Sequence, residues 1–217
     1  MGSLKSIFIT VVFLICFSVA LGYFLWYKEK FKPTDNTLSD VINIHSINNV
    51  EYIKVKNYGR SLRNTLTNSF NKDLCFLVDM SIPSGKKRFF VYNIKCDSIL
   101  ASGLVTHGSG CDKFRSSMLF SNEVNSNCTS LGKYKIGSSY YGRFGLAFKL
   151  YGLERSNSNA FDRFVVLHAH SCVPNEEVSP LPICKSLGCP TVSPEFLQKL
   201  KIYLESSGKP IILEIIK

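Results

Sequence analysis

Residues 164–190 read FVVLHAHSCVPNEEVSPLPICKSLGCP, a short apolar run followed at its far end by a Gly-Cys-Pro turn. The run ends in His168, and the turn places Cys189 between Gly188 and Pro190. Apolar β-branched residues favour a buried strand, and Gly with Pro favours a tight turn. A histidine at a strand end beside such a thiol can form a thiolate–imidazolium pair, because imidazole titrates near neutral pH. The stretch therefore predicts a cysteine nucleophile with a histidine base.

Two other interpretations of these residues stay open. Cys189 could be a buried or disulfide-bonded thiol beside a core histidine, because Cys/His spacings do not transfer between families. A zinc site is the second interpretation, since His168, His170 and Cys172 alternate with period two and share one face of an extended strand. Cys184 and Cys189 would complete a set of thiolate and imidazole ligands, although the chain has no Cys-x-x-Cys pair there.

Several short motifs precede and include this stretch. They are Thr106-His107-Gly108-Ser109-Gly110, Phe120-Ser121-Asn122, Ser130-Leu131-Gly132-Lys133-Tyr134, Tyr141-Gly142-Arg143-Phe144-Gly145, Leu150-Tyr151-Gly152-Leu153-Glu154, Asn157-Ser158-Asn159-Ala160 and Arg163. In this order and spacing the chain resembles the YkuD-type catalytic domain of murein L,D-transpeptidases, in the branch with a Ser-x-Gly-Cys-Pro motif. The resemblance runs from about Leu74 to the C-terminus, and the motifs are specific in combination.

The resemblance implies a role for each motif residue. Cys189 is the expected nucleophile and His168 the general base, while the backbone N–H groups of Gly188 and Cys189 face the oxyanion and Ser186 shapes the turn. The expected substrate-binding residues are His107, Asn122, Tyr141 and Arg163. His107 could instead be structural. Arg163 could hold a substrate carboxylate with two parallel hydrogen bonds, or pair with Asp162 or Glu154.

Three positions depart from the family pattern. Leu187 stands where the more widespread motif has His, Lys185 where Arg is common, and Ala169 where Gly often follows the base. None of these changes removes the thiol or the histidine. They concern substrate contacts and the shape of the pocket.

The resemblance implies acyl transfer on peptidoglycan stem peptides without a cofactor or metal. Cys189 would attack the L-centre carbonyl of a diaminopimelate–D-Ala bond, release D-Ala and form a thioester, which the side-chain amine of a second stem resolves into a crosslink. An L,D-carboxypeptidase would resolve the same thioester with water. A non-catalytic wall-binding or zinc-stabilised module is the third alternative, suggested by the three departures.

The charge of the chain suits anionic surroundings. Its 217 residues carry a formal net charge of +10, with a pI of about 9.2. Murein stems bear free carboxylates, to which a basic protein is attracted. The basic residues are scattered and no nucleic-acid motif is present, so we expect no nucleic-acid partner. We expect a monomer.

The N-terminus predicts membrane association. Ile7 to Tyr27 is uncharged and long enough at the helical rise to cross a hydrocarbon core of ~30 Å. Cleavage near Gly22 would make it a secretory signal, but the apolar run continues beyond that point, which favours an uncleaved anchor. Lys28, Lys30 and Lys32 would by themselves favour a cytoplasmic C-terminal side, in conflict with an extracytoplasmic substrate. The resemblance places the domain in the cell envelope.

We divide the chain into three parts: residues 1–30 as membrane anchor or signal segment, 31–72 as a polar, partly helical connector, and 73–217 as the catalytic domain. Weak helical character is expected at 39–47 and 61–70. No internal repeat is present.

The cysteines also indicate export. Eight cysteines are many for a reducing compartment. Setting aside Cys16 in the apolar span and Cys189 as a free nucleophile leaves six thiols. The simplest pairing joins neighbours, as Cys75–Cys96, Cys111–Cys128 and Cys172–Cys184, although the sequence allows every other pairing.

The remaining pattern predicts a mainly-β sandwich or barrel-like domain with one packed helix near its C-terminus. Strands are expected at 74–80, 88–94, 98–106, 146–150, 164–167 and 211–216, and long loops at 110–145. Ser193 can cap a helix that begins at Pro194, and Gly208 is placed to end it.

Overall fold

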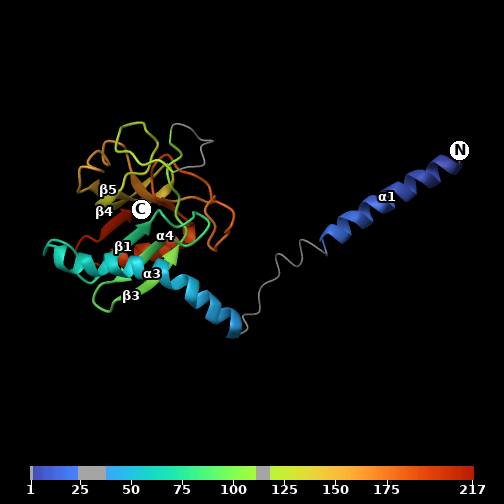
Figure 1. Ribbon diagram of the computed structural model, residues 1–217. Coiled ribbons are helices and arrows are strands. Elements are labelled where there is room, and N and C mark those ends of the chain that lie inside the picture. Colours follow the sequence, from blue (N-terminus) through green and yellow to red (C-terminus); the bar gives the residue numbers. More distant parts are fainter. Residues whose placement is uncertain (1, 24–37, 111–117) are drawn as a thin grey trace. The chain divides into compact units, whose positions relative to one another are not determined.

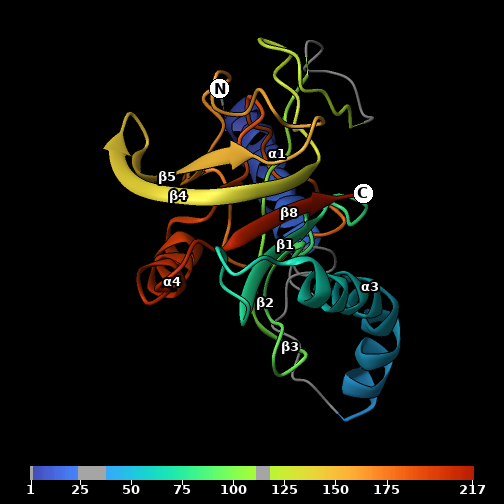
Figure 2. The same ribbon diagram turned by 90° about the vertical axis from the view of Figure 1, so that its left-hand side faces the viewer.

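The domain is organised around one twisted β-sheet, which Figures 1 and 2 show from two sides. A computed structural model of the protein describes residues 2–23, 38–110 and 118–217. The strands are β1 (Leu74–Asp79), β2 (Phe89–Asn93), β3 (Ser98–Gly103), β4 (Gly132–Gly142), β5 (Gly145–Gly152), β6 (Val166–Ala169), β7 (Thr191–Val192) and β8 (Ile212–Ile216). They pair in the order β3-β2-β1-β8-β4-β5-β6-β7. The helices are α1 (Gly2–Gly22), α3 (Leu38–Thr65) and α4 (Pro194–Glu205).

The last strand of the chain lies in the middle of the sheet. β8 is buried along its whole length and pairs parallel with β1, where Phe76 is opposite Leu213, and antiparallel with β4, where Tyr134 is opposite the same residue. A continuous Ile/Leu-rich run is what a strand covered on both faces requires. The expected strands β1, β2, β3 and β8 are confirmed.

Each face of the sheet has its own apolar core, because successive side chains of a strand point to opposite sides. On one face Phe76 and Phe89 pack with Phe196, Leu197 and Leu200 of α4. On the other face Val55 and Leu62 of α3 cover a second group of buried strand residues: Cys75, Leu77, Phe90 and Tyr92. The mainly-β class with a packed C-terminal helix is confirmed, and a second helix covers the opposite face.

The β4–β5 hairpin is the largest departure from the expected secondary structure. Residues 110–145 were expected to form loops, but β4 is the longest strand, with 11 residues. Its first part is half-buried and its last five residues are exposed, up to the turn where Gly142 pairs with Gly145. The outer part of this hairpin extends away from the core and needs no apolar residues. The apolar pattern of the sequence therefore did not predict these strand residues. Figure 2 shows this hairpin as a long curved ribbon.

Helix α4 begins where the sequence predicts. Ser193 Oγ accepts a hydrogen bond from the N–H of Phe196 at 3.1 Å, and Pro194 occupies the first helical position. The predicted end at Gly208 is wrong. Ser206 caps the helix with right-handed backbone angles, and its N–H donates to Ile202 O at 3.1 Å, so the last turn closes before any glycine is needed.

The folded domain extends further towards the N-terminus than residue 73. A compact unit spans Asn48–Lys217, and Val55 and Leu62 of α3 are buried against the sheet. Ion pairs join the same helix to the sheet: Lys54 pairs with Asp79 of β1, and Arg60 pairs with Asp97 in the turn between β2 and β3. This helix is mostly polar, which is why its composition predicts a connector. Its few apolar residues make the contact with the sheet.

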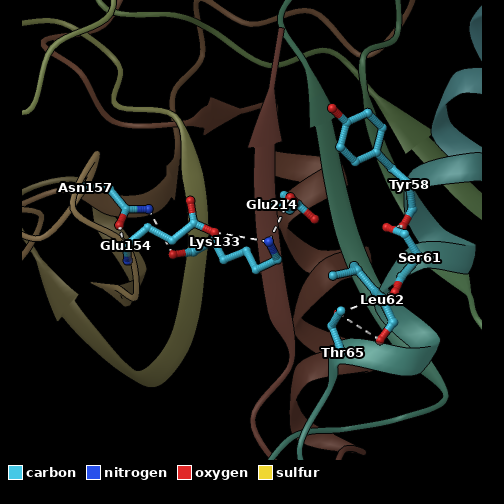
Figure 3. Close-up of polar contacts among 8 residues, drawn as sticks. All are labelled: Tyr58, Ser61, Leu62, Thr65, Lys133, Glu154, Asn157 and Glu214. Atoms are coloured by element: carbon cyan, nitrogen blue, oxygen red, sulfur yellow. Dashed lines mark hydrogen bonds and ion pairs between the residues drawn. The ribbon is translucent and has the colours of Figure 1, made fainter.

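Motif residues at the start of β4 build a turn rather than a pocket. Lys133 Nζ lies 3.1 Å from Glu154 Oε1 and 3.3 Å from Glu214 Oε1 (Figure 3). Asn157 is fully buried; its Nδ2 donates to Lys133 O at 2.8 Å and its Oδ1 accepts from Glu154 N at 2.9 Å. A Cβ at Gly152 would lie 1.8 Å from Asn157 O, so the turn needs glycine at that position.

The N-terminal residues form a separate unit, Met1–Ile47, which contains α1. Among the residues that the structure describes, no helix combines the length and the apolar character needed to cross a membrane. Lys28, Lys30 and Lys32 lie outside the described residues.

Candidate functional site

Two neighbouring strands at one end of the sheet bring His168 and Cys189 together. His168 lies on β6, and β7 pairs parallel with β6 so that His168 is opposite Thr191. Cys189 is two residues before Thr191, separated by Pro190 from the start of the strand beside the histidine. Their association depends on the pairing of β6 with β7.

The turn that carries Cys189 is held by side-chain hydroxyls. Ser186 Oγ donates to Cys189 O at 2.7 Å and accepts from Gly188 N at 3.2 Å. Gly188 has φ +112°, and a Cβ there would lie 2.7 Å from Cys128 O. Only glycine fits this position without displacing the backbone. Ser186 thus shapes the turn.

A second segment supports the turn from the side. Gly108 forms a β-bridge with Ser186, Ser109 N donates to Ser186 O at 2.8 Å, and Ser186 N donates to His107 O at 2.9 Å. Thr106 Oγ1 donates to Cys189 O at 3.2 Å. The Thr-His-Gly-Ser motif therefore acts through its backbone and its threonine.

A disulfide between Cys172 and Cys184 closes the site on the remaining side. It joins the segment that follows β6 to the segment that leads into the Cys189 turn. Of the three predicted pairs, this one is confirmed, and Cys189 is a free thiol as expected.

The pairing of Cys75 with Cys96 is wrong, because both thiols are free. Cys75 points into the core beneath α3, whereas Cys96 is exposed in the turn beyond β2. The pairing of Cys128 with Cys111 is not found: Cys128 is also a free thiol, and Cys111 lies outside the described residues.

Cys189 and His168 open into one cavity of about 220 Å³. The described residues that line it are Thr106, Phe144, His168, His170, Cys172, Lys185, Ser186, Leu187, Cys189 and Thr191. Lys185 is the only fully charged side chain among these, and no carboxylate is present among them. The cavity therefore suits a substrate that carries negative charge.

The thiol of Cys189 is neutral at rest. Its Sγ donates to Phe164 O at 3.7 Å and accepts from Val166 N at 3.5 Å. Burial raises the pKa of this thiol above its ordinary value, and the N–H of Val166 and the charge of Arg163 oppose the rise without cancelling it. In the part of the chain that the structure describes, no hydrogen bond joins Sγ to His168, so the resting site does not hold a thiolate–imidazolium pair.

His168 is fixed on three sides. Its Nδ1 lies 3.1 Å from Ala169 O, and its Nε2 lies 3.1 Å from Thr191 Oγ1. The ring of Phe144 stacks on the imidazole with centroids 4.7 Å apart and an interplanar angle of 22°. Burial lowers the pKa of His168, which favours the neutral form that a general base needs.

Backbone strain occurs beside the thiol. Phe164 has φ 54°, which is rare for a bulky residue, and its side chain is 84 % exposed. Its carbonyl accepts from the Cys189 thiol. Strained residues of this kind cluster at functional sites, and here the strained residue directs its carbonyl at the Cys189 thiol.

His107 serves the protein core rather than the cavity. It is 9 % exposed, and its Nδ1 accepts a hydrogen bond from Arg88 Nη2 at 3.1 Å. Burial, with the charges of Arg88 and Lys185, lowers the pKa of His107 to about 4. Its side chain is absent from the described lining of the Cys189 cavity.

Arg163 and Asn122 are committed to loop contacts. Arg163 donates from Nη1 to Ser121 O at 2.9 Å and from Nη2 to Cys128 O at 2.5 Å, directly beneath the Cys189 turn. Asn122 Nδ2 donates to Arg155 O at 3.0 Å, and its Oδ1 accepts from Asn159 N. Both side chains thus organise the loops beside the site, and neither of the two ion pairs considered for Arg163 is found in the described structure.

Tyr141 is 80 % exposed near the end of the β4–β5 hairpin and does not line the described part of the cavity. The hairpin instead contributes Phe144. Three residues of the cavity lining have no role in the sequence-based prediction: Phe144, Thr106 and Thr191. Thr191 had a usable signal, because it lies two residues after Cys189 and so shares its side of an extended chain.

The backbone donors expected for an oxyanion differ in their availability. The N–H of Gly188 is bonded to Ser186 Oγ, whereas that of Cys189 makes no hydrogen bond within the described residues. The zinc alternative loses Cys172 and Cys184 to the disulfide. Among the described residues, no group of three or more His, Cys, Asp or Glu side chains is placed to hold a metal ion.

Comparison with known proteins identifies one family. The family model described as L,D-transpeptidase catalytic domain matches residues 46–209. No curated protein matches the sequence. The match begins within α3, as does the compact unit.

Several solved structures are similar. The carbamoyl enzyme of Ldtfm with avibactam is 10 % identical with a TM-score of 0.41, over 68 % of this chain and 50 % of that one. The helical cell shape determining protein Pgp2 from Campylobacter jejuni is 13 % identical with a TM-score of 0.38, over 74 % and 54 %. A fused Zn-dependent amidase/peptidase/peptidoglycan-binding domain-containing protein from Clostridium acetobutylicum is 11 % identical with a TM-score of 0.38, over 77 % and 62 %. The chain spans about half the length of the first of these structures.

Proposed function

The chain belongs to the family of L,D-transpeptidase catalytic domains, and we propose that it is a murein L,D-transpeptidase with Cys189 as its nucleophile. The observation that carries this proposal is the shared cavity of the Cys189 thiol and the His168 imidazole. His168 is held with its Nδ1 on a backbone carbonyl, which leaves Nε2 to take the proton.

The first half-reaction is acylation. When the scissile carbonyl of a diaminopimelate–D-Ala bond lies against Cys189, the S–H bond breaks, the proton passes to His168 Nε2 and sulfur bonds to the carbonyl carbon. Because both groups are neutral at rest, the ion pair forms only as sulfur attacks. The carbon–nitrogen bond then breaks, the proton goes from His168 to the leaving D-Ala amine, and a thioester remains on Cys189.

The second half-reaction resolves the thioester. The side-chain amine of a second stem attacks the carbonyl carbon, His168 takes its proton, and the thiol of Cys189 leaves with a proton. In each step negative charge develops on the carbonyl oxygen. The N–H of Cys189 is the backbone donor that has no competing partner among the described residues, and we assign the oxyanion to it.

The cavity favours acidic peptides. Lys185 is the only fully charged side chain in its described lining, and the tip of the hairpin adds Arg143, whose guanidinium carbon lies 5.7 Å from the centroid of the Phe144 ring. Murein stems carry free carboxylates, which basic residues at the rim attract. The Cys172–Cys184 disulfide supports a place in an oxidising, extracytoplasmic part of the cell envelope.

Mass spectrometry of muropeptides tests the proposal. The full-length protein in detergent, incubated with disaccharide tetrapeptides, should form crosslinked dimers, and Cys189→Ser should form none, because a serine hydroxyl is far less acidic than a thiol. Tripeptides without dimers would identify the carboxypeptidase outcome. Unchanged tetrapeptides, or activity in Cys189→Ser, would overturn the assignment. Cys96→Ser is the matched control, since that thiol is exposed on the turn after β2.

A further inference from the structure

Both ring nitrogens of His168 already have partners before any substrate arrives. Nδ1 lies 3.1 Å from Ala169 O, and a carbonyl oxygen only accepts, so Nδ1 carries a hydrogen. In the neutral ring Nε2 then accepts, and the group beside it is Thr191 Oγ1 at 3.1 Å. The hydroxyl of Thr191 thus occupies the lone pair that must receive the proton of Cys189.

We infer that Thr191 is a positioning residue, whose hydroxyl holds His168 in place as a hydrogen-bond donor before proton transfer and as an acceptor after it. This inference rests on the proposed function, which makes His168 the base. Thr191 is 2 % exposed, and its place opposite His168 is set by the pairing of β6 with β7.

The hydroxyl hydrogen has two acceptors in reach. One is His168 Nε2 at 3.1 Å, and the other is Cys189 O at 3.4 Å. Cys189 O already accepts from Ser186 Oγ at 2.7 Å and from Thr106 Oγ1 at 3.2 Å. At rest the hydrogen therefore points to Nε2, the nearer and less crowded acceptor.

Proton transfer reverses the direction of this hydrogen bond. As the hydroxyl hydrogen turns to Cys189 O, the lone pair of Nε2 opens to the thiol. The S–H bond of Cys189 breaks, an N–H bond forms at Nε2, and Thr191 Oγ1 then accepts from the new N–H. The hydroxyl keeps its own hydrogen throughout, so the net change is one proton moved from sulfur to nitrogen.

The hydroxyl oxygen of Thr191 is important to a protonated His168 because few other groups near the ring can stabilise its charge. The titratable and charged groups that face it are His170 on its own segment, Lys185 and Cys189 in the cavity, and Arg143 behind the Phe144 ring. β5 places Ala147 opposite His168, and the adjoining cavity is lined from α4 only by Pro194, Leu197 and Gln198, which do not titrate. No carboxylate among the described lining stabilises the imidazolium, so its partners are Ala169 O and Thr191 Oγ1.

The test is the titration of His168 by NMR in the protein without substrate. Thr191→Val is nearly isosteric and removes both hydrogen bonds. Because a hydrogen bond to the charged ring is worth more than one to the neutral ring, the pKa of His168 should fall by about one unit. Thr191→Ser keeps the hydroxyl and should titrate close to the wild type. Thr65→Val is the control: this exposed hydroxyl bonds only to Ser61 O and Leu62 O within α3, and its loss should leave the titration in place.

Kinetics give a second readout. In Thr191→Val, kcat/KM for dimer formation should fall about tenfold, and its acidic limb should move to lower pH, while Thr191→Ser restores both. Thermal unfolding of each variant confirms that it is folded. An unchanged or raised pKa of His168 in folded Thr191→Val would overturn the inference. The titration needs no turnover, so it tests the role of Thr191 even if the protein is not a transpeptidase. If the proposed function is wrong, the wild-type protein itself will form no dimers.

Discussion

The regions around His107 and His168 contain the same side chain in a buried setting, but they differ in what surrounds it. His107 lies against the guanidinium of Arg88, which is itself fully buried and donates to Val105 O at 2.8 Å. His168 lies between a carbonyl, a hydroxyl and an aromatic ring, with one edge on the Cys189 cavity.

Burial lowers the pKa of both histidines, and a cation beside the ring lowers that of His107 further. A perturbed histidine is therefore a candidate base only when it also has access to a reacting group. The apolar run before each histidine does not by itself separate the two; the nearby Cys189 turn and the resemblance assigned the base to His168.

The largest expected effect is the loss of activity on replacement of His168. His168→Gln should reduce dimer formation by roughly 10³-fold, within the range of a general base, because Gln offers no titrating nitrogen. His107→Gln should leave the rate within about threefold. The rate of dimer formation by mass spectrometry distinguishes the two variants, and equal losses would show that the two regions do not differ in function.

Replacement of Arg88 should have the largest effect on stability. Its Nε and Nη atoms donate to Val105 O and, at 3.1 Å, to Ile82 O, and none of its described contacts is an ion pair. Arg88→Met leaves these buried carbonyls unpaired and should cost about 2–4 kcal/mol in the free energy of unfolding. Removal of the charge should also raise the pKa of His107. Chemical denaturation checks the first effect and NMR titration the second; a stability equal to wild type would mean that the cation is dispensable.

Loss of the disulfide should affect the region of His168 more than that of His107. Cys172→Ser with Cys184→Ser opens a loop of 12 residues and should destabilise the protein by about 2–3 kcal/mol, with a fall in activity below the unfolding transition. The pKa of His107 should shift only slightly, because its ring contacts neither segment and is reached only by the charge of Lys185, next to Cys184. Differential scanning calorimetry and activity measurements test this, with Cys96→Ser as the control. Full activity of the double variant would show that the disulfide does not position the residues of the site.

The smallest expected effect is on the pH dependence of stability. The pKa of His107 falls to about 4 in the folded protein, so between pH 6.5 and 4 the unfolded chain binds more protons. Stability should therefore be complete above pH 6.5 and decrease as the pH falls towards 4. With a discount for solvent screening of the charges around the ring, this amounts to about 1–2 kcal/mol. His107→Asn keeps an acceptor for Arg88 and should flatten this slope in urea denaturation at pH 4.5 and 7; an unchanged slope would contradict the assignment.

Local signals in the chain were sufficient for several elements. Ser193-Pro194 marks the start of α4, because a hydroxyl and a preset φ satisfy the first turn without tertiary help. The Ile/Leu run at 211–216 predicts a strand that must be covered on both faces, as β8 is. Long-range effects account for what was missed. The exposed arm of β4 has no apolar pattern. Cys75 and Cys96 look pairable in the sequence, but Cys75 faces the core beneath α3 and Cys96 is exposed in the turn after β2.

For the candidate site, the sequence by itself determined the residue types that the chemistry needs. They are a thiol on a Gly-Pro turn, a histidine after an apolar run, and the cysteines Cys172 and Cys184, which form a disulfide. These are local, because turn geometry and nucleophile chemistry depend on adjacent residues. Only the tertiary structure decided that Arg163 supports the turn from beneath, that His107 belongs to the core, and that Phe144 and Thr191 flank His168. Each of these contacts joins segments far apart in the chain, and strand pairing and burial, which no short pattern encodes, bring them together.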